Sequence, residues 1–395
     1  MTARRLAIEG GSPVRDGLLP YGRQTVTDRD IAAVTDALRS DFLTTGPRVG
    51  DFETALAEVA GARHAVAVSS GTAALHTMLA AAGVGPGDEV IVPVITFAAT
   101  ANAALYLGAR PVFADVDLET LLLDPRSVER CIRPHTRAIV AVDYAGQPAD
   151  YDALVAVAGD VPVYADACHA LGGSSNGKPV GALTEMSSFS FHPVKHVAAG
   201  EGGAITTDDD DLVEAMRSFR NHGITTDHAR RAAARTWTYD MEVLGFNYRL
   251  SDIHCALATS QLEGLSANVS RRQKIAARYD AGFRGLSGIT PLRTRDEVSN
   301  AHHIYVVLLE PSQFKSGRAE FFAALRAENI GVNVHYIPVP WHPYYQELGY
   351  ERGGWPVGED AYERMLTLPI WPGMSDYDAD DVIKAVNKVA TAYRR

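Results

Sequence analysis

Residues 188–203 read SFSFHPVKHVAAGEGG and place a single lysine, Lys195, between an apolar strand and a glycine-rich turn. A lysine amine attacks a carbonyl carbon only when it is unprotonated, so covalent chemistry requires surroundings that lower its pKa. Phe189, Phe191 and Val194 supply apolar surroundings, and the glycines that follow let the backbone approach closely. The pattern predicts a buried, positioned lysine rather than a solvated surface lysine.

A second segment, residues 161–173, reads VPVYADACHALGG and predicts an apolar strand that ends in a carboxylate, Asp166. Enzymes that use pyridoxal phosphate (PLP) need an acid against the ring nitrogen of the cofactor. The acid keeps that nitrogen protonated, so that the ring can accept the electrons released when a proton leaves the substrate carbon. Asp166 could instead cap a helix or lie in a loop, and its separation from Lys195 along the chain leaves both interpretations open.

Residues 64–83, HAVAVSSGTAALHTMLAAAG, predict a short apolar strand, a Ser-Gly-Thr turn and a helix. The N-terminus of a helix binds phosphate through its free N–H groups and its dipole. Gly71 lets the backbone come close to such a group, and Ser70 and Thr72 can add hydroxyl donors. Taken alone, this turn is also typical of an ordinary helix N-cap.

With these segments, the chain resembles the DegT/DnrJ/EryC1/StrS family of fold-type I PLP enzymes, which are best known as nucleotide-sugar aminotransferases. The resemblance covers essentially the whole chain. Within the family it is most similar to the aminotransferases of pseudaminic acid biosynthesis, which act on UDP-4-keto-6-deoxy-N-acetylhexosamines. The motifs that carry the resemblance lie at residues 20–24, 40–47, 69–75, 166–172, 190–195, 245–252 and 335–338.

The resemblance implies a role for each residue of the cofactor site. Lys195 would bind the cofactor aldehyde as a Schiff base, and Asp166 would pair with the pyridinium nitrogen. Phe97 matches the aromatic residue that stacks on the ring, and His169 matches the side chain beside the ring hydroxyl, although both could be core residues. Asn247 would reach the phosphate of the neighbouring subunit's cofactor, which implies a homodimer with shared active sites. The residues expected at the phosphate are Ser70, Gly71, Thr72 and Ser190.

The resemblance also implies where the nucleotide sugar binds, with L-glutamate as the amino donor. Similar enzymes use the early tyrosine, here Tyr21, and a segment around Tyr336. They also use the Leu-Thr-Thr-Gly turn, here Thr44, Thr45 and Gly46. A solvent-exposed turn is an equally good interpretation of this last segment, because Gly-Pro favours a turn whatever the function.

The bulk composition of the 395 residues limits the functional classes. A net charge of −11 argues against nonspecific binding to nucleic acid, so an anionic substrate would need a locally positive pocket. Arg23, Arg230, Arg231 and Arg235 could supply one, although a solvated helix face explains them slightly better. The three cysteines predict neither a disulfide framework nor a metal site and favour a reducing cytoplasm. No apolar run approaches the length of a membrane span, and the histidine spacing predicts no metal.

The alternation of apolar runs and helical patterns predicts an α/β fold with a mostly parallel seven-stranded sheet and a smaller C-terminal α/β domain. The expected division is an N-terminal segment at 1–25, a large PLP-binding domain at 26–262 and a small domain at 263–395. Strands are expected near 64–69, 88–95, 111–116, 137–143, 161–166, 186–191 and 202–207, with helices near 72–82, 98–107 and 149–159. The small domain is expected to contain helices near 266–284 and 317–328, strands near 303–309 and 331–336, and a last helix capped by Ser375 and Asp378.

Three alternative functions compete with transamination of a UDP-linked 4-ketone. Relatives that dehydrate a sugar at C3 carry histidine at the Schiff-base position, and Lys195 argues against that reaction. A non-catalytic regulatory protein with the PLP fold would have little reason to combine Lys195, Asp166 and Ser190. A nicotinamide oxidoreductase would require a glycine fingerprint that the sequence lacks. The acceptor could also be a dTDP- or GDP-linked keto sugar or an aminocyclitol ketone.

Overall fold

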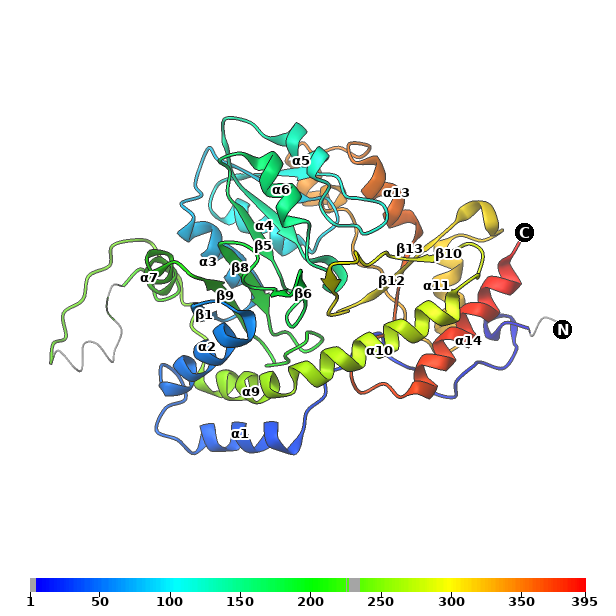
Figure 1. Cartoon of the computed structure of the whole chain (residues 1–395), viewed down its shortest axis with the longest axis horizontal. Helices are drawn as coiled ribbons and strands as arrows, with labels where there is room; N and C mark the ends of the chain where they lie inside the picture. The colour runs from blue at the N-terminus through cyan, green and yellow to red at the C-terminus, as the bar shows by residue number, and fades with distance from the viewer. Residues whose placement is uncertain (1–4, 225, 227–234) are drawn as a thin grey trace.

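A seven-stranded sheet forms the centre of the protein, and its strands follow the order β1-β9-β8-β5-β4-β2-β3 (Figure 1). The computed structural model describes residues 5–224, 226 and 235–395. Strands β3, β2, β4, β5 and β8 are mutually parallel, whereas β9 runs antiparallel to both of its neighbours. The predicted mostly parallel sheet is therefore confirmed. Its strands are β1 (His64–Val68), β2 (Glu89–Pro93), β3 (Arg110–Ala114), β4 (Thr136–Val142), β5 (Val163–Asp166), β8 (Met186–Ser190) and β9 (Gly203–Thr207).

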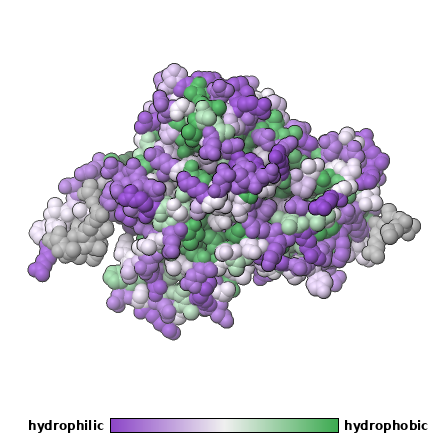
Figure 2. Space-filling view, viewed as in Figure 1, coloured by the Kyte–Doolittle hydropathy of each residue, from purple (hydrophilic) through white to green (hydrophobic). Residues whose placement is uncertain are grey.

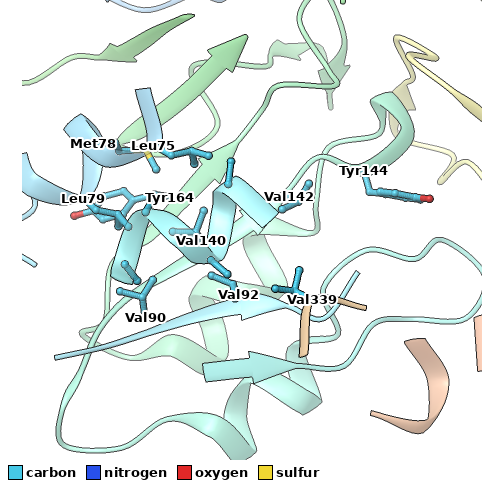
Figure 3. Packing of buried hydrophobic residues seen from close by; sticks show 14 of the residues in the cluster. Leu75, Met78, Leu79, Val90, Val92, Val140, Val142, Tyr144, Tyr164 and Val339 are labelled. Carbon is cyan, nitrogen blue, oxygen red and sulfur yellow. The ribbon is translucent and has the colours of Figure 1, made fainter. Parts of the chain in front are cut away.

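Helices cover this sheet, and helix α3 contributes to a large apolar core. Leu75, Met78 and Leu79 on helix α3 belong to one buried cluster with Val92 and Val140 of the sheet (Figure 3). Burial of this kind is the main favourable contribution to folding. The helices of this part are α1 (Asp28–Leu38), α2 (Pro47–Ala60), α3 (Gly71–Ala81), α4 (Ala98–Tyr106), α5 (Pro125–Cys131), α6 (Tyr151–Ala158), α7 (Asp210–Phe219) and α9 (Asp252–Glu263).

A second, antiparallel sheet with the order β10-β12-β13 forms the core of the C-terminal part. The last helix begins where predicted, because Ser375 and Asp378 form the expected capping box. The elements are α10 (Leu265–Phe283), β10 (Ile289–Pro291), β12 (Tyr305–Leu309), α11 (Arg318–Ala327), β13 (Met365–Leu368) and α14 (Asp376–Tyr393). Shorter elements are α12 (Pro343–Glu347), α13 (Pro356–Arg364), η1 (Ala7–Glu9), η2 (Tyr144–Gly146), η3 (Pro311–Gln313) and η4 (Val339–Trp341).

The strand expected at 331–336 is wrong. These residues make only an isolated bridge, between Asn333 and Thr367, and strand β13 takes the place beside β12. Strand β13 lies within residues 338–372, a segment that also contains helices α12 and α13. Residues 331–336 instead run toward the end of the large sheet, where Tyr336 contacts residues of that part.

Helices α9 and α10 follow one another with a single residue, Gly264, between them, and together they form a long rod (Figure 1). Helix α9 packs on α1 and α2, and helix α10 packs on α14. A small sheet of β6 (Ser174–Ser175), β7 (Lys178–Pro179) and β11 (Val298–Ser299) also joins distant parts of the chain. The division into domains 26–262 and 263–395 remains our proposal, and the rod crosses the proposed boundary.

The surface of the protein is largely hydrophilic on the face shown in Figure 2, and hydrophobic residues reach it in separate areas. Over the described residues, no helix combines the length and the apolar character needed to cross a membrane. Within the same residues, no cluster of three or more His, Cys, Asp and Glu side chains has an arrangement suited to a metal ion.

Candidate active site

Asp166 lies at the carboxyl end of β5 and is 5% exposed. Strand β5 pairs in parallel with β4 and β8, so that Asp166 lies opposite Val142 on one side and Ser188 on the other. Its Oδ2 accepts a hydrogen bond from the Thr100 hydroxyl at 2.7 Å, and its Oδ1 accepts one from the Cys168 N–H at 3.3 Å. A buried carboxylate requires such donors, and these two fix its orientation.

Lys195 lies in the loop that joins β8 to β9. Phe191 closes this loop, because its carbonyl accepts a hydrogen bond from the Ala199 N–H at 2.9 Å. Lys195 is half-buried, and desolvation lowers the pKa of its ammonium group although nearby acidic groups, Asp166 among them, oppose the shift. The fold therefore brings the lysine within electrostatic reach of Asp166. A lowered pKa favours the free amine that covalent lysine chemistry requires.

The N-terminus of helix α3 lies against the end of strand β8. Helix α3 begins at Gly71, and the Ser70 hydroxyl caps it by accepting a hydrogen bond from the Ala73 N–H at 3.1 Å. A Cβ atom on Gly71 would stand 2.7 Å from Cβ of Ser190, so only glycine permits this approach. Thr72 follows in the first turn and is half-buried. Free N–H groups and two serine hydroxyls meet here, which is the chemistry of an anion site.

Two aromatic residues and a histidine line another side of this region. The Phe97 side chain is 59% exposed, and its ring centroid lies 5.8 Å from that of Tyr336. The Tyr336 hydroxyl lies 3.2 Å from Nε2 of His169, within hydrogen-bond distance. Among the described residues, no group pairs with the buried Nδ1 of His169. The exposed ring of Phe97 is available for stacking, and His169 retains an unused polar atom.

Tyr21 approaches the site from the N-terminal segment. Its ring centroid lies 5.4 Å from that of His335, and its carbonyl accepts a hydrogen bond from the Ile370 N–H at 3.1 Å. The neighbouring Gly22 lies against the lysine loop, since a Cβ on it would come within 3.6 Å of Val194 Cγ1. The segment that the sequence assigned to substrate binding thus lies beside the loop of Lys195.

Three further histidines lie around this site, and the sequence assigned a role to none of them, although His335 begins the motif at 335–338. His196, His303 and His335 are each less than 10% exposed, and burial is the main cause that lowers the pKa of each. The charge of Lys195 adds to this effect for all three. The His303 ring lies closest to a predicted residue, with its centroid 4.3 Å from that of His169. Only its place at the first residue of the predicted strand 303–309 could have drawn attention to it.

The structure does not bring all predicted substrate residues to Lys195 within one chain. Thr44, Thr45 and Gly46 precede helix α2, where the Gly46 N–H donates to the Asp252 carboxylate at 2.8 Å. Together with Tyr239, Leu244 and Arg249, among others, they line a separate cavity of about 1610 Å³. Asn247 is exposed and pairs its backbone with Asn221. In the part of the chain that the structure describes, these residues form no contact with Lys195.

Two of the arginines considered for a positive pocket, Arg23 and Arg235, are exposed. Arg230 and Arg231 lie outside the described residues. The exposure of Arg23 and Arg235 agrees with the alternative of a solvated face.

The residues of the site fit PLP. The close approach of Gly71 to Ser190 leaves a helix N-terminus open for a phosphate, and the unused Nδ1 of His169 can bind a polar ring substituent. A lysine with a lowered pKa can take up the aldehyde, and a buried carboxylate suits a protonated ring nitrogen. The arrangement supplies one group for each polar part of the cofactor.

Comparison with known proteins connects this geometry to a family. The sequence model of the DegT/DnrJ/EryC1/StrS aminotransferase family matches residues 24–387. The spore coat polysaccharide biosynthesis protein SpsC of Bacillus subtilis is 40% identical over 380 residues, which cover 95% of this chain and 98% of SpsC.

Two solved structures have the same fold over nearly their whole length. Helicobacter pylori PseC, an aminotransferase involved in pseudoaminic acid biosynthesis, superposes with a TM-score of 0.89 at 30% identity, covering 95% of this chain and 100% of PseC. Spr1654 of Streptococcus pneumoniae, described as a sugar aminotransferase, superposes in its PMP form with a TM-score of 0.89 at 31% identity, covering 95% and 99%. Spr1654 is also solved in a PLP form. These matches establish that the chain belongs to the DegT/DnrJ/EryC1/StrS family and is a PLP-dependent sugar aminotransferase.

Proposed function

We propose that the enzyme transfers the amino group of L-glutamate to the ketone of a UDP-linked 4-keto-6-deoxy-N-acetylhexosamine. The observation that best supports transamination is Lys195, half-buried and with a lowered pKa, within electrostatic reach of Asp166. The sugar assignment is supported by the similarity to PseC, which acts in pseudoaminic acid biosynthesis, and to SpsC, which acts in polysaccharide biosynthesis.

The proposed chemistry depends on one amine and one carboxylate. PLP, when bound, supplies an aldehyde that takes up the amino group and a ring that accepts electrons. Lys195 Nζ, as a free amine, would remove the α-proton of the donor and would carry a proton to the carbon that takes up the amino group. The Asp166 carboxylate would keep the ring nitrogen protonated. The same proton transfers in reverse order aminate the sugar ketone, so a single base serves both half-reactions.

The remaining cofactor residues would bind and orient the ring. Phe97 would stack on the ring, which its exposed position supports, and His169 would contact the ring hydroxyl through its unused nitrogen. The close packing of Gly71 on Ser190 supports a phosphate site at this point. The residues assigned to the phosphate are Ser70, Gly71, Thr72 and Ser190.

The sugar nucleotide would bind on the side of Tyr21 and Tyr336. Tyr336 reaches His169, and Tyr21 lies beside the lysine loop through Gly22, so both tyrosines border the proposed ring position. Thr44, Thr45 and Gly46 would complete the pocket from a neighbouring subunit, because within one chain they lie away from Lys195.

We propose a homodimer in which Asn247 reaches the partner's cofactor phosphate. Residues 235–246 project from the main body beyond α7 (Figure 1) and expose large apolar side chains. Trp237 is 87% exposed and Leu244 is 79% exposed. Contiguous exposed apolar side chains are typical of an interface. A second copy that covers them would also bring Asn247 to the site.

We also propose that the enzyme acts in the cytoplasm. The three cysteines are free thiols in the structure. Structural disulfides are typical of oxidising compartments, whereas free thiols are typical of reducing ones.

The test is the visible absorption of purified enzyme loaded with PLP, recorded after L-glutamate and then after the UDP-4-keto sugar. We expect the yellow form to bleach with glutamate and to return with the sugar. A protein that never binds PLP as a yellow form would contradict the cofactor chemistry. Bleaching without return would keep the aminotransferase and reject the acceptor, and a dTDP-linked 4-keto sugar added next would test the other nucleotide.

A further inference from the structure

A buried arginine without a carboxylate partner lies next to the histidines of the site. Arg272 on helix α10 is 2% exposed and takes part in no ion pair among the described residues. Desolvation lowers the pKa of its guanidinium to about 10, so the group remains charged at neutral pH. A buried charge without a counter-ion costs free energy, and hydrogen bonds must offset part of that cost.

Among the described residues, the hydrogen bonds of Arg272 all go to backbone carbonyls. Its Nη1 donates to the carbonyls of Ile370 at 2.9 Å, His303 at 3.1 Å and His302 at 3.2 Å. Within the described residues its Nε has no partner. One nitrogen therefore joins helix α10 to two separate segments of the C-terminal part.

Both of these segments lead into the candidate site. His303 lies with its ring 4.3 Å from His169 and 5.7 Å from His196. Ile370 donates its N–H to the carbonyl of Tyr21. Arg272 thus fixes the backbone of His303 relative to the segment that holds Tyr21.

We propose that Arg272 is a positioning residue of this aminotransferase, which sets the His303 ring against His169 and so fixes the orientation of His169 toward the cofactor. The inference rests on the proposed role of His169. The positive charge of Arg272 also contributes to lowering the pKa of His303 and of His196, so it favours the neutral form of both rings. Neutral imidazoles add no positive charge beside Lys195.

The neighbouring Arg271 provides a matched control. It also lies on helix α10 and donates through Nε and Nη2 to a backbone carbonyl, that of Met374, at 3.1 and 2.6 Å. Its Nη1 pairs with Asp376 at 2.7 Å on the surface. Like Arg272, Arg271 bonds to the backbone of the C-terminal part, but among the described residues its hydrogen bonds go to Met374 and Asp376 and not to the carbonyls of His302 and His303. A purely structural role predicts the same consequences for both arginines.

The experiment compares Arg272→Lys with Arg271→Lys in the PLP-loaded enzyme. The readouts are the melting temperature and the pH titration of the cofactor's visible band, which needs no amino donor or sugar. We expect Arg272→Lys to move the titration midpoint and Arg271→Lys to leave it unchanged. We also expect the rate of bleaching by glutamate to fall about tenfold or more in Arg272→Lys, because small displacements of site groups have effects of this size. Equal titrations in the two variants would overturn the proposal.

A second variant, His303→Asn, removes the ring and leaves the arginine in place. The proposal requires it to move the midpoint in the same direction as Arg272→Lys. The double variant should then add nothing to His303→Asn, because residues that act through one another are not additive. Additive effects in the double variant would refute the positioning role of Arg272. An unchanged midpoint in His303→Asn would also refute it, and this test does not depend on whether Arg272→Lys folds. A wrong sugar assignment would leave all these readouts unaffected.

Discussion

The hydroxyl of Thr100 donates a hydrogen bond to Oδ2 of Asp166 at 2.7 Å, and neither side chain is appreciably exposed to solvent. The Thr100 oxygen also lies 2.7 Å from that of Thr96. A chain of two hydroxyls, Thr100 on helix α4 and Thr96 just before it, therefore supports the carboxylate. The proposed partner of the cofactor nitrogen is held by this helix as well as by its own strand.

Thr100→Val should weaken PLP binding while keeping the shape of the side chain. Loss of the donor leaves Asp166 with one hydrogen bond fewer, which costs about 1–3 kcal/mol of folding free energy for a buried group. We expect the Kd for PLP, measured by fluorescence titration of the apoenzyme, to rise about tenfold or more. Thr100→Ser keeps the hydroxyl and should behave as wild type. An unchanged Kd in the valine variant would show that Thr100 does not support Asp166.

Gly71→Ala should displace helix α3 from strand β8. The added Cβ would stand 2.7 Å from Cβ of Ser190, where neither backbone can move without disturbing the sheet. Overpacking of this kind costs about 1–3 kcal/mol, and phosphate binding should weaken with it. Gly50→Ala on helix α2 is the matched control, because nothing lies within 4 Å of its added Cβ. Denaturant unfolding and PLP titration of both variants test the difference, and equal results would contradict the tight packing.

Lys195→Ala should abolish both the yellow form of the enzyme and transamination. The protein should stay folded, because the lysine is partly desolvated and its removal relieves that cost. Absorption spectra and circular dichroism of the PLP-loaded variant check the two statements. Measurable turnover with glutamate and a keto sugar would refute the assigned role of Lys195.

Acid should destabilise the protein between pH 6.5 and about 4. Burial lowers the pKa of His76, His302 and His335 to about 4 and that of His196 to about 3. In this window the unfolded chain binds protons that the folded chain does not, so stability falls as the pH falls. Burial raises the pKa of Asp143 to about 7. This single carboxyl group opposes the trend, because it holds a proton in the folded chain over a pH range in which the unfolded chain has lost it.

His76 allows this pH dependence to be tested outside the candidate site. It packs among Tyr106, Phe219 and Phe246, so His76→Phe suits its surroundings. The variant should reduce the slope of stability against pH by one proton, about 1.4 kcal/mol per pH unit. Unfolding curves at pH 5, 6 and 7 measure the slope. A slope equal to that of wild type would mean that His76 is protonated in the folded protein.

Local patterns were enough to predict the large sheet and the residues at the ends of its strands. Lys195 and Asp166 follow apolar runs whose length and flanking residues identify strands directly. Strand β13 gave no such signal, because its four residues lie in a segment rich in proline and aromatic residues. The approach of His303 and Arg272 to His169 depends on chain segments far apart in sequence, and no local pattern reports such contacts.

The rod of α9 and α10 has a mechanical consequence. Because α9 packs on α1 and α2 and α10 packs on α14, the same rod belongs to both parts of the protein. Stretching or sliding of one part against the other would have to break hydrogen bonds within the helices, whereas bending at Gly264, which caps the end of α9 and the start of α10, leaves the interior of both helices intact. The two parts are thus held at a fixed spacing, and rotation about one glycine is the movement that the architecture permits most easily.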